Sequence, residues 1–288
     1  MKILKKTGIL ALSLCLLLNT TPQEVNAGTI KLNKTQVTLY SGNKTTLKVT
    51  GTTKHIMWTT SDKKIATVSS KGVVYGKTKG SAIISARIGS GSTGKTLKCK
   101  VTVKNKIIIP KSQIFVTLGE YEEIIVKDRG LKPDEYVYFF TDYNKNVNFE
   151  WDKNNYDILI AEGQKIGKSS VVLRVADDWG IPIGNEKHTI DVYVLRDQSG
   201  WISWKDLKYF ADIEKINYGD EVEYYIDSLK EISDSGIVKY SLSFTLPSDL
   251  VENTIYSVKA SKSNTVRYKI TNKQLYFNVK DLISANLI

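Results

Sequence analysis

The chain is built largely from short segments in which apolar and polar residues alternate, separated by turns rich in glycine, asparagine and aspartate. The segment from Val238 to Leu246 is the clearest example. An alternation of period two places every second side chain on the same face of a strand, so each segment predicts a strand with one buried and one wet face. Many short strands joined by turns predict an all-β fold made of sandwiches.

Length and composition narrow the possibilities further. A chain of 288 residues is long enough for two domains of about 150 residues or for three small β modules. The apolar fraction of 41% and the charged fraction of 25% are ordinary for a globular protein. Because there are only two cysteines and two histidines, zinc fingers, disulfide frameworks and most histidine-based catalytic sites are excluded.

The N-terminal segment predicts export. Three lysines precede an apolar run of eleven residues, Gly8 to Leu18, and Val25-Asn26-Ala27 follows as a small-residue cleavage site. We therefore expect residues 1–27 to be a signal peptide and the mature chain to be secreted or extracellular, either free or associated with the cell surface. The run is too short to span a bilayer, and no later segment predicts a transmembrane span.

Residues 28–105 carry an ordered set of motifs. They are Trp58-Thr59-Thr60-Ser61-Asp62, Ile65-Ala66-Thr67-Val68-Ser69, Gly72-Val73-Val74, Gly80-Ser81-Ala82-Ile83-Ile84-Ser85-Ala86 and Cys99-Lys100-Val101-Thr102-Val103. Over residues 29–104 this set resembles the bacterial immunoglobulin-like group 2 domain family. The resemblance implies a β-sandwich found on secreted and cell-surface bacterial proteins, as a stalk, an adhesin module or an accessory to wall and polysaccharide enzymes. It implies no catalytic residues.

The alternation also predicts which side chains form the core of this domain. We expect Cys99 to be a buried strand thiol, since free cysteine is among the most buried residue types. The ring of Trp58 is expected to fill the space between the sheets rather than to bind a sugar. The predicted structural core comprises Trp58, Ala66, Val68, Ala82, Ile84, Cys99, Val101 and Val103.

Residues 106–196 are interpreted as a diverged second copy. At a constant offset of 77, the residues Val37, Leu39, Gly42, Leu47 and Val49 correspond to Ile114, Val116, Gly119, Ile124 and Val126. Further on, Val147 to Trp151 is interpreted as the counterpart of the Trp58 strand, and the segment after Gly167 as that of the Gly80 strand. Repetition on this scale is typical of a domain array, so a second immunoglobulin-like sandwich is predicted.

Residues 197–288 predict a β-rich C-terminal domain with one short helix. Ser203 with Asp206 predicts a capping box, followed by two or three helical turns that carry Leu207, Phe210 and Ala211 on one face. Strands then follow as a meander. The spacing of Ile216, Gly219, Tyr224 and Ile226 repeats the opening spacing of the other modules, which suggests a third, strongly diverged sandwich. The fold class is therefore all-β, with tandem immunoglobulin-like modules.

Candidate ligand contacts are few. Trp179 lies in a predicted loop beside two aspartates, and Trp201 opens the last region; an exposed ring could stack on a sugar, whereas a buried one would pack on a neighbouring module.

Gly163 to Ser169 resembles a phosphate loop but has three residues between its glycines instead of four. The acidic residues near Asp142 lack the glycine and the glutamate of an EF-hand, so at most a looser calcium site at Asp142 or Asp152 is compatible. No metal and no cofactor are predicted.

The charge is concentrated in one module. The formal net charge is +11, but residues 28–105 contain fifteen basic residues and one acidic residue, whereas residues 106–196 and 197–288 have net charges of −3 and −2. Nearly all of the excess is lysine, a hydrated point charge suited to diffuse attraction. For a secreted protein this favours an anionic cell-wall polymer or a surface glycan over nucleic acid as partner.

The functional prediction is a secreted or cell-surface immunoglobulin-like array that acts in adhesion, display or cell-wall association, with its basic first module contacting an anionic surface. No enzyme is predicted, because His55 and His188 are isolated in separate modules and no nucleophile motif occurs. One alternative is a carbohydrate-binding accessory protein that uses Trp179, Trp201 or exposed tyrosines. Another is a subunit of a secreted surface assembly that docks on another surface protein.

Overall fold

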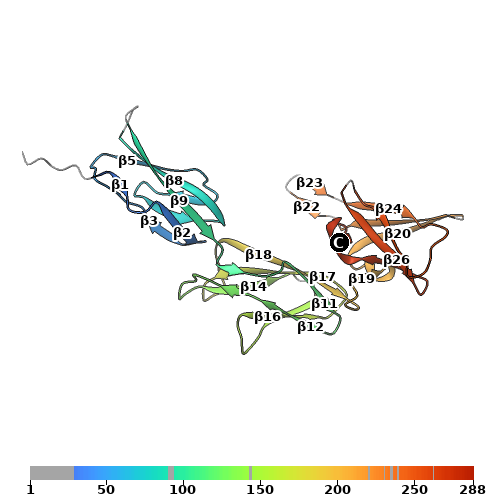
Figure 1. The fold of residues 1–288 in the computed structure, drawn as a ribbon. Helices are drawn as coiled ribbons and strands as arrows, with labels where there is room; N and C mark the ends of the chain where they lie inside the picture. Colours follow the sequence, from blue (N-terminus) through green and yellow to red (C-terminus); the bar gives the residue numbers. More distant parts are fainter. Residues whose placement is uncertain are drawn as a thin grey trace, which may run out of the picture.

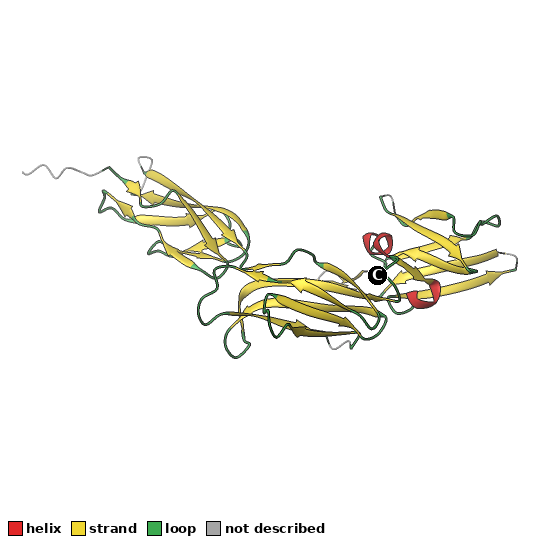
Figure 2. Cartoon of the chain, turned by 60° about the horizontal axis from the view of Figure 1, so that its bottom comes forward, coloured by secondary structure: helices red, strands yellow, loops and turns green. Residues whose placement is uncertain are grey.

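A computed structural model describes residues 29–89, 94–142, 145–219, 221–229, 231–233, 236–238, 240–261 and 263–288. The predicted signal peptide, residues 1–27, lies outside the described residues. The strands form three groups that follow one another along the molecule (Figure 1), and nearly all of the described chain is strand or loop (Figure 2). No helix in the described part is long and apolar enough to cross a membrane.

The first group is a sandwich of two sheets. Its four-stranded sheet has the order β2 (Gln36–Tyr40), β9 (Lys95–Lys104), β8 (Gly80–Ile88), β5 (Ile56–Thr60), and its three-stranded sheet has the order β3 (Lys44–Thr46), β7 (Val73–Gly76), β6 (Ala66–Val68). A short pair, β1 (Lys31–Leu32) and β4 (Val49–Thr50), lies beside them. The pairing of β2 with β9 is parallel, and the other pairings are antiparallel.

The inward residues of these strands form the core of the first sandwich. Six of the eight predicted core residues are buried: Ala66, Ala82, Ile84, Cys99, Val101 and Val103. Trp58 and Val68 are half-buried and pack against the same cluster. The ring of Trp58 covers Gly72, where a Cβ atom would lie 2.9 Å from it.

The second group repeats this topology strand for strand. Its four-stranded sheet is β11 (Gln113–Thr117), β18 (Pro182–Leu195), β17 (Gly167–Ala176), β14 (Tyr136–Thr141), and its three-stranded sheet is β12 (Tyr121–Ile125), β16 (Ile158–Gly163), β15 (Val147–Trp151). The short pair is β10 (Ile107–Ile108) with β13 (Lys127–Asp128). The first pairing, β11 with β18, is again parallel.

The two sandwiches also share the turn after their first long strand. Gly42 and Gly119 have positive φ angles of 80° and 82°. The Gly42 amide donates to the carbonyl of Gly76, and the Gly119 amide donates to the carbonyl of Gly163, both at 2.8 Å. The offset of 77 therefore joins residues that occupy the same place in two sandwiches.

One predicted correspondence is wrong. The strand Val147–Trp151 does not correspond to the Trp58 strand, because β15 pairs with β16 in the smaller sheet, whereas β5 pairs with β8 in the larger one. The counterpart of β5 is β14, where Phe139 stands opposite Leu173 as Trp58 stands opposite Ala86. Both candidate strands alternate and contain aromatic residues, so the local pattern does not say which sheet each strand joins.

The third group consists of two antiparallel sheets with a shared aromatic core. One sheet is β19 (Trp201–Ser203), β27 (Gln274–Asn278), β26 (Thr265–Thr271), β25 (Ile255–Lys259); the other is β20 (Ala211–Tyr218), β21 (Glu221–Ser228), β24 (Ser241–Thr245). A further pair is β22 (Glu231–Ser233) with β23 (Gly236–Val238). Phe244 of one sheet contacts Tyr268 and Phe277 of the other at ring distances of 5.5 and 5.7 Å.

The sequence predictions for the third group need three corrections. The helix capped by Ser203, α1 (Trp204–Leu207), has four residues rather than two or three turns, and Ala211 already begins β20. A second helix, α2 (Val279–Ser284), was not predicted. Ile216 and Tyr224 lie on the adjacent strands β20 and β21 of one antiparallel sheet. The corresponding strands of the first two sandwiches, β2 and β3 or β11 and β12, join different sheets.

The second and third groups share part of a core. Tyr193 and Leu195, at the end of β18, belong to the hydrophobic cluster of the third group. The ring of Tyr193 stacks on Phe210 at 6.3 Å and on Phe115 at 5.5 Å. These two groups are therefore joined by apolar packing, and the domain boundaries at residues 105 and 196 stay predictions.

Candidate functional site

The outer face of the larger sheet in the first sandwich is basic. Along β9, Cys99, Val101 and Val103 point into the core, so the alternate residues Lys98, Lys100 and Lys104 point outward and are exposed. Arg87 is exposed on the neighbouring strand β8. We call Arg87, Lys98, Lys100 and Lys104 the basic face.

The strand positions paired with the three lysines of the basic face carry no negative charge. On β8, Ser85 and Ile83 pair with Lys98 and Lys100. On β2, Gln36 and Tyr40 pair with Lys100 and Lys104. The single acidic residue between positions 28 and 105, Asp62, accepts the backbone amide of Lys64 at 2.7 Å in a turn. Alternate residues on a strand are about 6.6–6.8 Å apart, so Lys98 and Lys100 are neighbours on the face, while Thr102 separates Lys100 from Lys104. The charges are therefore spread along the strand, which suits an extended anion rather than one compact anion.

The two predicted tryptophan contacts lie in different groups of strands. Trp179 stands at the tip of the β17–β18 hairpin with 87% of its surface exposed. The Asp177 carboxylate fixes this tip by accepting the amides of Trp179 and Ile181 at 3.0 and 2.8 Å. Trp201 is half-buried, and the ammonium of Lys269 lies 4.7 Å from the centre of its ring. The structure does not bring the two rings into one site.

The acidic residues considered for calcium bind the backbone instead. The Asp142 carboxylate accepts the amide of Ser170 at 3.1 Å, and the Asp152 carboxylate accepts the amides of Asn154 and Asn155 at 2.7 and 2.9 Å. Within the described residues, no group of three or more His, Cys, Asp or Glu side chains could hold a metal ion.

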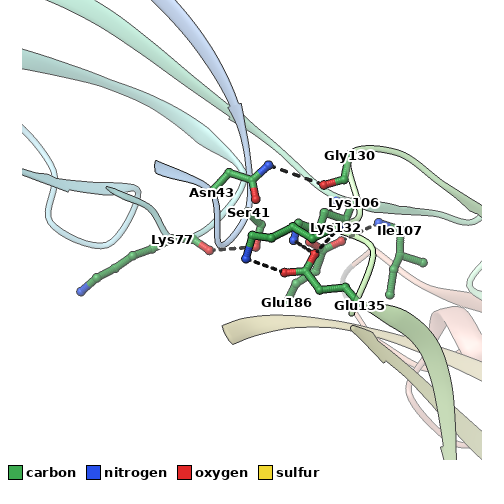
Figure 3. A network of polar contacts seen from close by, with 9 residues as sticks. All are labelled: Ser41, Asn43, Lys77, Lys106, Ile107, Gly130, Lys132, Glu135 and Glu186. Carbon is green, nitrogen blue, oxygen red and sulfur yellow. Dashed lines mark hydrogen bonds and ion pairs between the residues drawn. The ribbon is translucent and has the colours of Figure 1, made fainter. Parts of the chain in front are cut away.

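A buried polar network lies where the first sandwich meets the second (Figure 3). Lys106, only 2% exposed, forms an ion pair with Glu135, whose side chain is 1% exposed. Glu135 also accepts the amide and the ammonium of Lys132, both at 3.0 Å. Gly130 contacts the first sandwich, where the Asn43 side chain donates to its carbonyl at 3.5 Å.

Glu186 completes this network from β18. Its carboxylate accepts the backbone amides of Lys106 and Ile107 at 2.9 and 2.8 Å, and it lies 3.0 Å from Nε2 of His188. We call Lys106, Glu135, Glu186 and His188 the junction network. In the segment between the two sandwiches, the network binds the side chain of Lys106 and the backbone amides of Lys106 and Ile107.

Comparison with known proteins identifies the first sandwich. Residues 27–101 match the family model described as bacterial Ig-like domain (group 2). The first sandwich is a group 2 bacterial Ig-like domain. No curated protein sequence matches the chain.

Solved structures resemble the chain only weakly. Domains 4 and 5 of the S-layer protein SbsC are 18% identical, covering 57% of this chain and 96% of that chain, with a TM-score of 0.24. A fragment with SbsC domains 4–9 is 16% identical, and the match covers 87% of this chain and 42% of that fragment, with a TM-score of 0.25. A chimeric titin Z1Z2 tandem is 13% identical over 57% of this chain and 98% of that chain, with a TM-score of 0.23. These values are too low to carry over a fold or a function.

Burial and hydrogen bonding act in opposite directions on the junction network. Burial alone would raise the pKa of the Glu135 and Glu186 carboxyls. The hydrogen bonds from Lys106 and Lys132 outweigh burial at Glu135, and those from His188, Lys106 and Ile107 outweigh it at Glu186. The pKa of each carboxyl is therefore lowered. In the unfolded chain both would titrate near 4.5.

Acid is expected to loosen the junction beside the group 2 domain. Because the folded pKa values lie below the unfolded ones, this contribution to stability is complete above about pH 4.5 and is lost as the pH falls through the folded values. We expect the urea midpoint of Glu186→Gln to fall less steeply than that of the wild type between about pH 6 and pH 3. Glu150→Gln, at an exposed position of β15, should leave the wild-type slope unchanged. Parallel slopes for all three proteins would contradict the expectation.

The local sequence does not mark the junction network. Lys106 lies two residues after the last strand of the group 2 domain, between Asn105 and Ile107, like many linker lysines. Its partners Glu135 and Glu186 are 29 and 80 residues away. The one local signal is the pair Glu186 and His188, two residues apart on one strand and therefore on one face.

Proposed function

We propose that the chain is a non-enzymatic array of Ig-like modules at a bacterial surface, held on an anionic cell-wall polymer or surface glycan by the basic face of its group 2 domain. The observation that carries this proposal is the location of the charge. The group 2 domain holds the whole positive excess of the chain, and thirteen of its fourteen lysines are exposed.

Two physical features support contact with an extended anion. Lysine heads are hydrated and move freely on long stems, so they adapt to a flexible chain of negative charges. Since exposed charges interact over a screening length of about 8–10 Å at physiological salt, several lysines on one flat face can act on one polymer together. The remaining modules are slightly acidic and would project away from the same surface.

The test is retention on purified cell walls at low and high salt. We expect the variant Lys98→Gln/Lys100→Gln/Lys104→Gln to bind about tenfold more weakly at low salt, because each exposed ionic contact contributes about 0.2–1 kcal/mol. High salt should release the wild type and reduce the difference. The three positions are exposed strand residues, so their substitution should leave thermal stability nearly unchanged.

A matched control removes the same charge elsewhere. Lys127, Lys165 and Lys187 are exposed lysines of the second sandwich, and their replacement by glutamine should leave retention nearly as in the wild type. Equal loss in both triple variants would indicate net charge rather than the basic face. Retention that salt does not change would contradict the proposal altogether.

A further inference from the structure

The second sandwich contains an open groove along one side, between the edge strands of its two sheets. Its volume is about 700 Å³, within the range of about 300–1,000 Å³ found for small-ligand sites. Phe139 of β14 and Trp151 of β15 line it, together with Leu131, Tyr136 and Tyr156. We propose that this groove binds a neutral oligosaccharide.

In the group 2 domain, a tryptophan ring occupies the position that corresponds to this groove. There, the ring of Trp58 lies against Gly72 in the turn between β6 and β7. In the second sandwich the smaller Phe139 occupies the position of Trp58, and the turn between β15 and β16 has six residues instead of four. The groove is therefore a local departure within a repeated topology.

Aromatic rings form the floor and the rim of the groove. Phe139 and Trp151, from opposite sheets, lie with ring centres 6.0 Å apart, and Trp151 is half-buried. Tyr136 and Tyr156 are 47% and 77% exposed. Such rings offer flat apolar faces and, in the tyrosines, a polar edge, which matches a sugar ring with its apolar C–H face and its hydroxyl rim.

Two carboxylates favour a neutral sugar over an acidic one. Asp128 and Asp157 line the groove and are exposed, and neither has an ion-pair partner among the described residues. A carboxylate accepts hydrogen bonds from ligand hydroxyls. It would repel the carboxylate or phosphate of an anionic sugar. The groove thus differs in chemistry from the basic face.

The loop that carries Tyr156 is held in place before any ligand binds. Asp152 accepts the amides of Asn154 and Asn155, and the Asn155 side chain accepts the amide of Asp157 at 3.0 Å. The amide of Ile158 closes the loop by donating to the Asn155 carbonyl at 3.0 Å. Because little order has to be created on binding, a groove with few polar contacts can still hold a ligand.

The test uses the full chain and four neutral hexasaccharides: cellohexaose, maltohexaose, mannohexaose and hexaacetylchitohexaose. Titration calorimetry should detect binding of at least one of them, accompanied by a change in tryptophan fluorescence. The variant Tyr156→Ala should weaken binding about tenfold, which corresponds to about 1.4 kcal/mol. The matched control Tyr121→Ala removes a tyrosine that is 61% exposed on β12 of the same sandwich and should bind as the wild type.

Three outcomes would overturn the inference. They are no binding of any of the four sugars at millimolar concentration, equal effects of Tyr156→Ala and Tyr121→Ala, and stronger binding of choline than of the sugars, which would indicate a cation cage. Asp157→Asn gives a further readout, since it should raise the affinity for hexagalacturonate relative to the neutral sugars. The triple lysine variant of the basic face should bind the neutral sugars as the wild type, so the two proposals fail independently.

Discussion

Replacing Lys106 by leucine is expected to destabilise the junction by about 3 kcal/mol, although leucine fits a buried position well. The substitution removes the ammonium that pairs with Glu135, a carboxylate with a side chain that is 1% exposed. Breaking a buried ion pair from one side typically costs about 3–5 kcal/mol, because the remaining charge stays out of water. We expect the lower end of this range, since Lys132 still reaches Glu135 at 3.0 Å.

The matched control uses the second partner of the same carboxylate. Lys132 is 53% exposed, so Lys132→Leu should cost less than about 1 kcal/mol. Urea unfolding followed by tryptophan fluorescence compares the two, and the midpoints are compared directly because several modules need not unfold in one step. Similar shifts for both variants would mean that the buried pair adds no more than an exposed one.

Replacing Gly72 by alanine is expected to destabilise the group 2 domain by about 3 kcal/mol. Gly72 has a φ of +77°, and a left-handed conformation costs a residue with a Cβ about 1–2 kcal/mol. The added methyl would also overlap the carbonyl oxygen of Leu47 and lie 2.9 Å from the ring of Trp58. The Leu47 amide donates to the Gly72 carbonyl at 2.9 Å, so the backbone cannot move aside without losing that bond.

Gly42→Ala separates the cost of the left-handed backbone conformation from the cost of the steric overlap. Gly42 has a similar φ of +80°, but a Cβ there meets only the end of the Lys106 side chain, at 3.7 Å. We expect a loss of about 1–2 kcal/mol, which represents the backbone conformation alone. Thermal unfolding of the full chain, monitored through tryptophan fluorescence, measures both variants. Equal losses would show that the space around Gly72 relaxes freely.

Much of the first sandwich could be predicted from local patterns. Along β9, the alternation of lysines with Cys99, Val101 and Val103 already determines which side chains face the core and which face water. The glycines at positions 42 and 119 mark the same positive-φ turn, which is why the offset of 77 was visible without a structure. The same alternation located the basic face, since outward strand residues are known once the inward ones are.

The partners of strands and of buried charges could not be predicted in this way. An alternation of period two predicts the two faces of a strand but not the sheet that the strand joins. For this reason the pattern places the Trp151 strand in the wrong sheet. The pattern overestimates the length of α1 and does not predict α2 for a related reason, since so few helical residues leave little periodicity to detect.

The sequence by itself determined the fold class, the repeat and the concentration of charge in the group 2 domain, because these depend on composition and on neighbours a few residues apart. Only the tertiary structure decided that Lys106 is buried and that Phe139 and Trp151 leave a groove open between two edge strands. Each of these features joins residues that the chain brings together from distant positions. The free energy of burial depends on those neighbours in space, and the local sequence does not contain them.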